Sequence, residues 1–203
     1  MKNMTFRALA LTALLPCLAF CADWDPGKTQ GNPKAPVAIE IYSSYDCPHC
    51  RFLHETMYPQ MLRDLVNTGK AVLISREFPL TGFGHEHARE AAIIATAAAR
   101  IGKYNEVSDA LFKTQATWAQ NGKIWDSLNG VLSAAELNKV KALATDSGVV
   151  GEVERDSQAA AMSGLNQTPT LIVISQKTGK RYPFVGVPAS YDIFRDFILK
   201  DLN

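Results

Sequence analysis

The sequence predicts an α/β protein in which a strand–helix–strand segment and a strand–strand–helix segment are separated by a block of helices. The first observation is a run rich in β-branched residues, Val37 to Tyr42, shortly before the tetrapeptide Cys47-Pro48-His49-Cys50. The second is a stretch from 84 to 160 in which apolar residues follow helical spacing. The third is a return to continuous apolar sequence at Leu171 to Ser175, which is typical of a buried strand.

The first strand–helix–strand segment is predicted from Val37 to Phe78. The strand Val37 to Tyr42 is followed by helical spacing from Pro48 to about Asn67, within which Pro59 should kink or divide the helix. Ala71 to Phe78 supplies the second strand. Because a helix joins the two strands, we expect them to be parallel, with a right-handed crossover.

The helical block should contain four main helices. Glu90 to Arg100 is dense in alanine, the best helix former. Tyr104 to Trp118 carries apolar residues on one face, and Ser133-Ala134-Ala135-Glu136 is a capping box that opens a helix reaching about Thr145. Gly151 to Met162 supplies the fourth helix.

The chain should then close with two strands and a helix. Leu171 to Ser175 and Arg181 to Val187 are separated by a turn that contains glycine, and Tyr191 to Leu199 has the apolar face of a helix. We therefore divide the mature protein into a first core part at 22–83, a helical insert at 84–160 and a second core part at 161–203.

Residues 1–21 have the layout of a cleaved secretory signal peptide. Lys2 and Arg7 precede an apolar stretch from Ala8 to Phe20, which is shorter than the roughly 20 residues that a membrane span needs. Cleavage after Ala19 or after Cys21 fits the small-residue requirement. An uncleaved anchor and a lipid on Cys21 are the alternatives. The sequence thus predicts a periplasmic or otherwise exported protein.

The net charge and the number of cysteines limit the classes of function that the sequence supports. The chain has 21 Lys+Arg and 20 Asp+Glu, and loss of the signal peptide removes two basic residues, so neither nucleic acid nor an anionic membrane is indicated as a partner. Of four cysteines, only Cys47 and Cys50 fall within the predicted folded body. A disulfide between residues three apart closes too small a loop to stabilise a fold, so this pair is predicted to be reactive.

The position of the two cysteines favours thiol–disulfide exchange. A thiol reacts as its thiolate, whose ordinary pKa lies near 8.5. Pro48 suits the first position of a helix, which would make Cys47 the N-cap residue beside the unpaired amides of the first turn. His49 adds a hydrogen bond or positive charge, whereas Asp46 opposes a second anion unless exposure screens it. We expect Cys47 to be the exposed nucleophile and Cys50 the shielded resolving thiol.

From about Asn32 onwards the chain resembles the DsbA-type thiol:disulfide oxidoreductases. The tetrapeptide Cys47-Pro48-His49-Cys50 matches the active-site sequence of that family, and similar counterparts exist for Ala35-Pro36-Val37, Glu40, Phe78-Pro79-Leu80 and Thr168-Pro169. The resemblance implies a thioredoxin-like fold with an inserted helical domain.

The resemblance also implies specific roles for residues outside the tetrapeptide. Pro169 is expected to be cis and to lie beside the cysteines, with the backbone of Thr168 available to pair with an extended substrate peptide. Glu40 is expected to relay a proton to or from Cys50, although a strand residue that reaches solvent at a sheet edge is an equally good interpretation. Reduced exported polypeptides would be the substrates, and a membrane redox partner would reoxidise the pair. We expect a monomer with no cofactor.

Other functions and sites remain open from the sequence. Zinc on Cys47, Cys50 and His54 would lack a fourth ligand of suitable spacing, so no metal site is predicted, and His54, His85 and His87 are expected to be surface residues. The alternatives to a disulfide donor are a reductase or isomerase kept reduced by a membrane partner, a non-catalytic peptide-binding or chaperone-like module, and a small-molecule transferase or isomerase that does not need Cys50.

Overall fold

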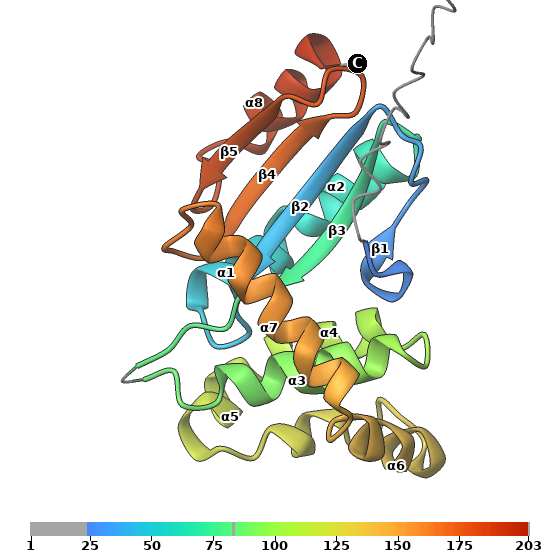
Figure 1. The fold of residues 1–203 in the computed structure, drawn as a ribbon, viewed down its shortest axis with the longest axis vertical. Coiled ribbons are helices and arrows are strands. Elements are labelled where there is room, and N and C mark those ends of the chain that lie inside the picture. The colour runs from blue at the N-terminus through green and yellow to red at the C-terminus, as the bar shows by residue number, and fades with distance from the viewer. Residues whose placement is uncertain (1–23, 83, 203) are drawn as a thin grey trace, which may run out of the picture.

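A five-stranded mixed sheet forms one half of the molecule (Figure 1). The computed structural model describes residues 24–82 and 84–202. The strands lie in the order β1-β3-β2-β4-β5; β2 and β3 are parallel, and the other three pairs are antiparallel. Their bounds are β1 Thr29–Gln30, β2 Val37–Ser43, β3 Ala71–Glu77, β4 Thr170–Ser175 and β5 Arg181–Val185. The predicted parallel crossover and fold class are confirmed; the two-residue β1 was not predicted.

The helices that precede the insert's segment of the chain, together with the C-terminal helix, cover one face of this sheet. α1 (Pro48–Thr56), α2 (Tyr58–Met61) and the π-helical η2 (Leu62–Val66) connect β2 to β3, and α8 (Tyr191–Asp196) continues into the π-helical η4 (Phe197–Asp201). Pro59 lies in the first turn of α2, so it divides the predicted helix in two. The core on this face contains the buried side chains of Ile39, Ile41, Leu53, Met61, Leu73, Leu171 and Phe194.

The helical insert packs below the sheet and contains more elements than the sequence predicts. They are α3 Ala88–Ala99, α4 Tyr104–Lys113, α5 Gln115–Asn121, the 3-10 helix η3 Ile124–Leu128, α6 Ala134–Leu143 and α7 Ser147–Met162. The single helix expected from Tyr104 to Trp118 breaks at Thr114, whose hydroxyl donates to Ala110 O and lies 2.7 Å from Ser127 Oγ. The capping box at Ser133 is present.

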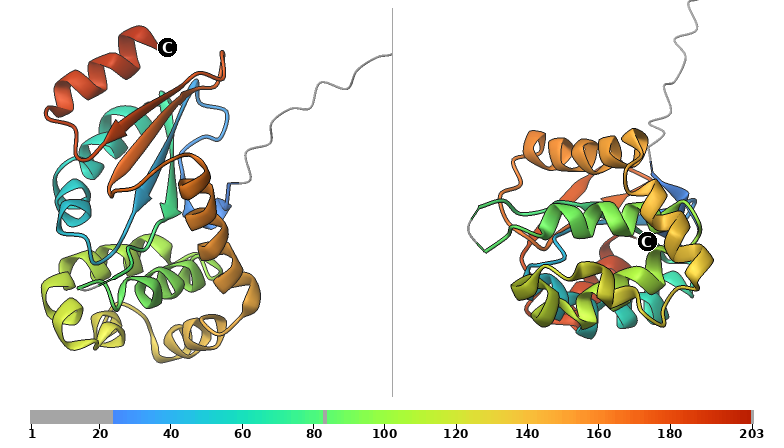
Figure 2. Two further views of the ribbon diagram at one scale, coloured as in Figure 1. Left: turned by 60° about the vertical axis from the view of Figure 1, so that its left-hand side comes forward. Right: turned by 90° about the horizontal axis from the view of Figure 1, so that it is seen from below.

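α7 links the insert to the sheet (Figure 2). It begins at the Asp146 N-cap, where Asp146 Oδ1 accepts from the backbone N–H of Gly148 and Val149. It then packs against both α3 and β3. The boundary predicted between 160 and 161 falls inside this helix.

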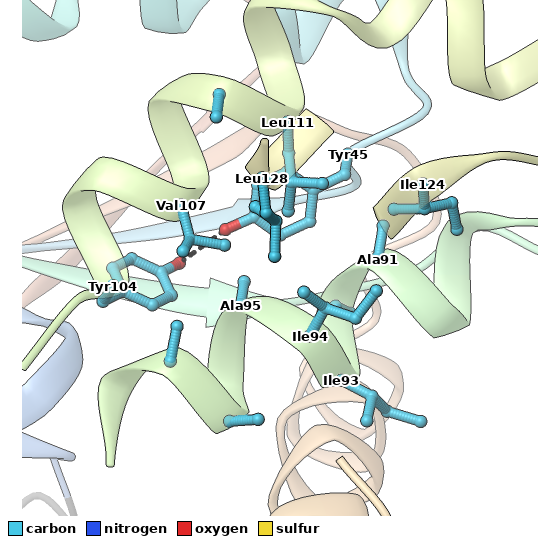
Figure 3. Close-up of a cluster of buried hydrophobic side chains, with 14 of the residues drawn as sticks. Tyr45, Ala91, Ile93, Ile94, Ala95, Tyr104, Val107, Leu111, Ile124 and Leu128 are labelled. Carbon is cyan, nitrogen blue, oxygen red and sulfur yellow. Dashed lines mark hydrogen bonds between the residues drawn. The ribbon is translucent and has the colours of Figure 1, made fainter. Parts of the chain in front are cut away.

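The core of the insert, part of which is drawn in Figure 3, extends to the cysteines. Alanines of α3 allow close packing by α4, and Leu111, Trp118, Ile124 and Leu128 are almost completely buried. Tyr45, Cys47 and Cys50 belong to the same cluster. The cysteine pair therefore lies where the insert meets the sheet.

The predicted signal peptide lies outside the described residues. Among the residues that the structure describes, we find no helix with the length and apolar character of a membrane span.

Candidate active site

The two cysteines lie at the N-terminus of α1. Cys47 is the N-cap residue in extended conformation (φ −78°, ψ 120°), and Pro48 is in the first turn, as the sequence predicts. Pro48 and His49 are exposed, whereas both cysteines are free thiols that are 5% and 1% exposed. Cys47 is thus more buried than expected, because the segment before β4 covers it.

The environment of Cys47 favours its thiolate. The pKa of Cys47 is lowered from 9.0 to about 5, mainly by a hydrogen bond from the Cys50 thiol. Burial opposes this change, and a contact with Thr168 and the backbone N–H groups of Cys50 and His49 support it. The contribution of His49 therefore comes from its backbone amide at the start of the helix.

The environment of Cys50 favours its neutral thiol. Burial raises the pKa of Cys50 well above 9.0, and the neighbouring Cys47 sulfur adds to this effect. The Ser44 backbone N–H lies 3.5 Å from Cys50 Sγ. The pair therefore consists of one thiol that ionises easily and one that does not, an asymmetry suited to a nucleophile and a resolving thiol.

Thr168 and Pro169 lie against Cys47 from the opposite side. The Thr168–Pro169 peptide bond is cis, in agreement with the expectation from family resemblance. Cys47 Sγ lies 3.4 Å from Thr168 O, and Gly186 N donates to Pro169 O at 2.8 Å, which ties this loop to the segment after β5. Thr168, Pro169 and the cysteines are therefore brought together, while the pairing of Thr168 with a substrate peptide stays a prediction.

Polar contacts that the sequence did not predict hold the loop before Cys47. Asp46 is 7% exposed; its Oδ1 accepts from Ser44 Oγ at 2.7 Å, and its Oδ2 lies 2.9 Å from His85 Nδ1. Asp46 is therefore not screened by solvent. Gln115 Nε2 of α5 donates to Tyr45 O and Cys47 O at 2.5 and 3.0 Å. A long-range contact of this kind leaves no signal in local sequence.

The histidines differ from the surface positions expected for them. His54, His85 and His87 are half-buried. His54 stacks on Tyr58, and its Nε2 lies 2.6 Å from Asp109 Oδ1. Among the described residues, no group of three His, Cys, Asp or Glu side chains is arranged to hold a metal ion.

Glu40 lies on the face of the sheet away from Cys50. It is 4% exposed in the central strand β2, and its two carboxylate oxygens lie 3.0 Å from Arg76 Nη2 and 2.7 Å from Arg181 Nη2. Its neighbours Ile39 and Ile41 face α1, so alternation directs Glu40 to the other side. The interpretation of Glu40 as a solvent-reaching edge residue is wrong, and the structure does not bring it to Cys50.

Comparison with known proteins defines the class of protein. The thioredoxin family profile matches residues 25–184, so the chain belongs to the thioredoxin family. Within that family its fold is that of the DsbA proteins. Wolbachia pipientis α-DsbA1 superposes with a TM-score of 0.69 at 21% identity, over 85% of this chain and 89% of that one. Pseudomonas aeruginosa DsbA2 does so with a TM-score of 0.65 at 25% identity, over 87% and 96%. The DsbA-type resemblance is thereby confirmed.

Relatives identified by sequence similarity have names that refer to protein disulfide chemistry. A Rickettsia prowazekii protein provisionally named a protein-disulfide oxidoreductase is 26% identical over 161 residues, which are 79% of this chain and 52% of that protein. Disulfide bond formation protein D of Bacillus subtilis is 23% identical over 182 residues, 85% of this chain and 76% of that protein. The chain spans about half the length of the Rickettsia relative.

Proposed function

We propose that this protein is an exported thiol:disulfide oxidoreductase that introduces disulfides into other exported proteins. The observation that carries the proposal is the asymmetry between Cys47, with a pKa of about 5, and Cys50, with a raised pKa. Stabilising the Cys47 thiolate stabilises the reduced pair, which makes the disulfide form the stronger oxidant.

The exchange would use each cysteine in turn. A substrate thiolate attacks Cys47 Sγ of the Cys47–Cys50 disulfide, and Cys50 leaves with the electron pair of the broken bond. A second substrate thiolate then attacks the substrate sulfur of this mixed disulfide and displaces Cys47 as a thiolate. The substrate leaves with a disulfide, and two electrons remain on the cysteine pair. Pro48 and His49 shape the N-terminus of the helix that stabilises the leaving thiolate.

Substrate and partner follow from the surroundings of Cys47. An extended polypeptide would lie along Thr168 and Pro169, next to the sulfur that it attacks. A membrane redox partner would reoxidise the pair after each cycle, and the predicted signal peptide would place both reactions in an exported compartment, where disulfides persist. We propose that the protein acts as a monomer without a cofactor.

The equilibrium with glutathione tests the direction of electron flow. We expect a potential clearly above that of thioredoxin, about −270 mV, towards that of DsbA, about −120 mV. A value at or below that of thioredoxin would instead indicate a reductase or isomerase. The matched variants are Cys47→Ala and Cys50→Ala, each of which should abolish oxidation of a reduced protein substrate. A wild-type protein that oxidises no substrate, and that binds peptides equally well with and without Cys47, would indicate a non-catalytic module. A catalysed reaction that persists in Cys50→Ala would indicate a single-thiol enzyme.

A further inference from the structure

Glu77 is a buried carboxyl group that the exchange described above does not use. It ends β3 and is 2% exposed. Burial is the largest cause that raises the pKa of Glu77 from 4.5 to about 8; the charge of Asp156 adds to the rise, while Lys28 and the Tyr104 hydroxyl oppose it. Glu77 therefore changes protonation state close to neutral pH, the range in which a general acid or base is most effective.

The strand register places Glu77 on the Cys50 side of the sheet. Ser43 and Glu77 are partners in the parallel pair β2–β3, so their side chains point to the same face. Ile41, two residues before Ser43, packs with Leu53 of α1 on that face. Ser43 also lies beside Cys50, because a hydrogen bond between the Ser43 side chain and the sulfur affects the Cys50 pKa.

A small cavity connects the carboxyl group to the thiol. It has a volume of about 30 Å³, and its lining includes Cys50, Ser43, Ser75 and Glu77. A polar cavity of more than roughly 10–15 Å³ can hold a water molecule when two or more polar groups are available to it. Proton exchange between Glu77 and Cys50 therefore has both the space and the hydrogen-bonding groups that it needs.

Two buried tyrosines fix the position of the carboxyl group. Tyr104 donates its hydroxyl to Glu77 Oε1 at 3.0 Å, and Tyr45 donates to the Tyr104 oxygen at 3.2 Å. Figure 3 shows these two hydroxyl groups facing each other within the core of the insert. Burial raises the pKa of both tyrosines well above 10.0, so they stay neutral and orient Glu77 rather than titrate with it.

We propose that Glu77, and not Glu40, exchanges the proton of Cys50 across this cavity during thiol–disulfide exchange. The proposal rests on the proposed function and names the acid–base group of the same site. It follows from the register, which sets Glu77 beside Ser43 on the Cys50 face, whereas Glu40 is paired with two arginines on the opposite face.

The protons and electrons balance in both directions. When a substrate thiolate attacks Cys47, the Cys47–Cys50 bond breaks and its electron pair goes to Cys50. Protonated Glu77 supplies the proton that converts Cys50 to a neutral thiol, and the Glu77 carboxylate later regains a proton from solvent. During reoxidation, the Cys50 thiol transfers its proton to the Glu77 carboxylate while its sulfur attacks a mixed disulfide on Cys47, and the partner leaves as a thiolate.

A chromogenic aromatic disulfide separates the two thiol steps. Cys47 attacks the reagent and releases one coloured aryl thiolate; Cys50 then attacks Cys47 and releases the second. The second rate constant of the wild-type protein should rise with pH through an inflection near 8, as Glu77 ionises. Glu77→Gln should remove this inflection and slow the second step on the order of a hundredfold, while the first step is unchanged.

Control variants separate Glu77 from its neighbours. Its titratable or charged neighbours, including those that line the same cavity, are Lys28, Tyr45, Cys50, His54, Tyr58, Arg76, Tyr104, Glu152 and Asp156. Glu40→Gln and His54→Gln should keep the inflection. Tyr104→Phe should keep the maximal rate but move the inflection to higher pH, because it removes a hydrogen bond that lowers the pKa of Glu77.

Several results would overturn the proposal while leaving the proposed function intact. They are a wild-type profile without an inflection near 8, a normal second step in Glu77→Gln, or loss of the inflection in Glu40→Gln. The wild-type and Tyr104→Phe profiles decide the matter even if Glu77→Gln does not fold. A slow first step in the wild-type protein would instead count against the activated Cys47, and so against the proposed function.

Discussion

The pKa of Cys47 predicts a pH-dependent stability of the reduced protein. A pKa of about 5 against an ordinary value of 9.0 means that about 99% of Cys47 is a thiolate at pH 7 in the folded state, against about 1% in the unfolded state. Because the folded pKa is depressed, this stabilisation is complete above pH 9 and is lost as the pH falls to 5.

The magnitude at pH 7 follows from the distance to the folded pKa. Each pH unit between 5 and 9 contributes about 1.4 kcal/mol, so Cys47 should stabilise the reduced protein by about 3 kcal/mol at pH 7. Cys50, whose pKa lies well above 9.0, is protonated in both states at this pH and adds nothing. For a two-electron couple, about 3 kcal/mol corresponds to a rise of about 60 mV in the potential of the pair.

The assay must remove the opposing effect of Glu77. The pKa of Glu77 is raised from 4.5 to about 8, so its burial costs stability as the pH rises from 4.5 and offsets about 3 kcal/mol at pH 7. Denaturant unfolding of the reduced protein should therefore be compared with Cys47→Ser at each pH, since both proteins contain Glu77. The difference between them should grow by about 2 kcal/mol from pH 5 to pH 7, because Cys47 is already half ionised at pH 5. A difference that does not change with pH, or an alkylation midpoint near 9, would refute the thiolate argument.

Three further substitutions probe the surroundings of this thiolate. Asp46→Asn removes a buried negative charge next to Cys47, so the pH midpoint of Cys47 alkylation should fall. The equilibrium with glutathione should become about threefold to tenfold more oxidising. An unchanged midpoint would show that His85 already neutralises this charge. His49→Ala keeps the backbone N–H that contacts the sulfur, so the midpoint should rise only slightly, and a rise to the ordinary value would assign the effect to the imidazole instead. Glu40→Gln removes the carboxylate that Arg76 and Arg181 share. Because Arg76 keeps Asp156 and Arg181 is half exposed, the free energy of unfolding should fall by only about 1 kcal/mol, with no change in Cys47 alkylation; a changed alkylation midpoint would connect Glu40 to the active site after all.

Local sequence was sufficient to predict the reactive centre. A strand, a Pro at the first helical position and two cysteines one turn apart predict Cys47 at the N-cap and Cys50 behind it, because these features depend on a few consecutive residues. The cis Thr168–Pro169 bond came from family resemblance alone. The burial of Cys47 could not be predicted, since it depends on a loop more than a hundred residues later in the chain.

Glu77, which lines the same cavity as Cys50, could have been located from the sequence pattern. Alternation indicated that Glu40 and Ile41 face opposite sides, but it did not indicate which side carries α1. The carboxyl ends of parallel strands meet at one edge of a sheet, and Glu77 ends the strand next to β2. A polar residue at that position, two after Ser75 on the same face, was the available sign. The break at Thr114 had no comparable sign, because it depends on contact with Ser127.

Gln115 of the helical insert donates hydrogen bonds to the carbonyl groups of Tyr45 and Cys47. The active site is therefore built by both the thioredoxin core and the insert. An isolated thioredoxin core, cut free of its insert, would lose the amide that anchors its reactive turn. Grafting a foreign insert onto this core would accordingly alter the chemistry of the sulfurs as well as the outline of the surface. A change in the insert near Gln115 should therefore also change the redox potential of the Cys47–Cys50 pair.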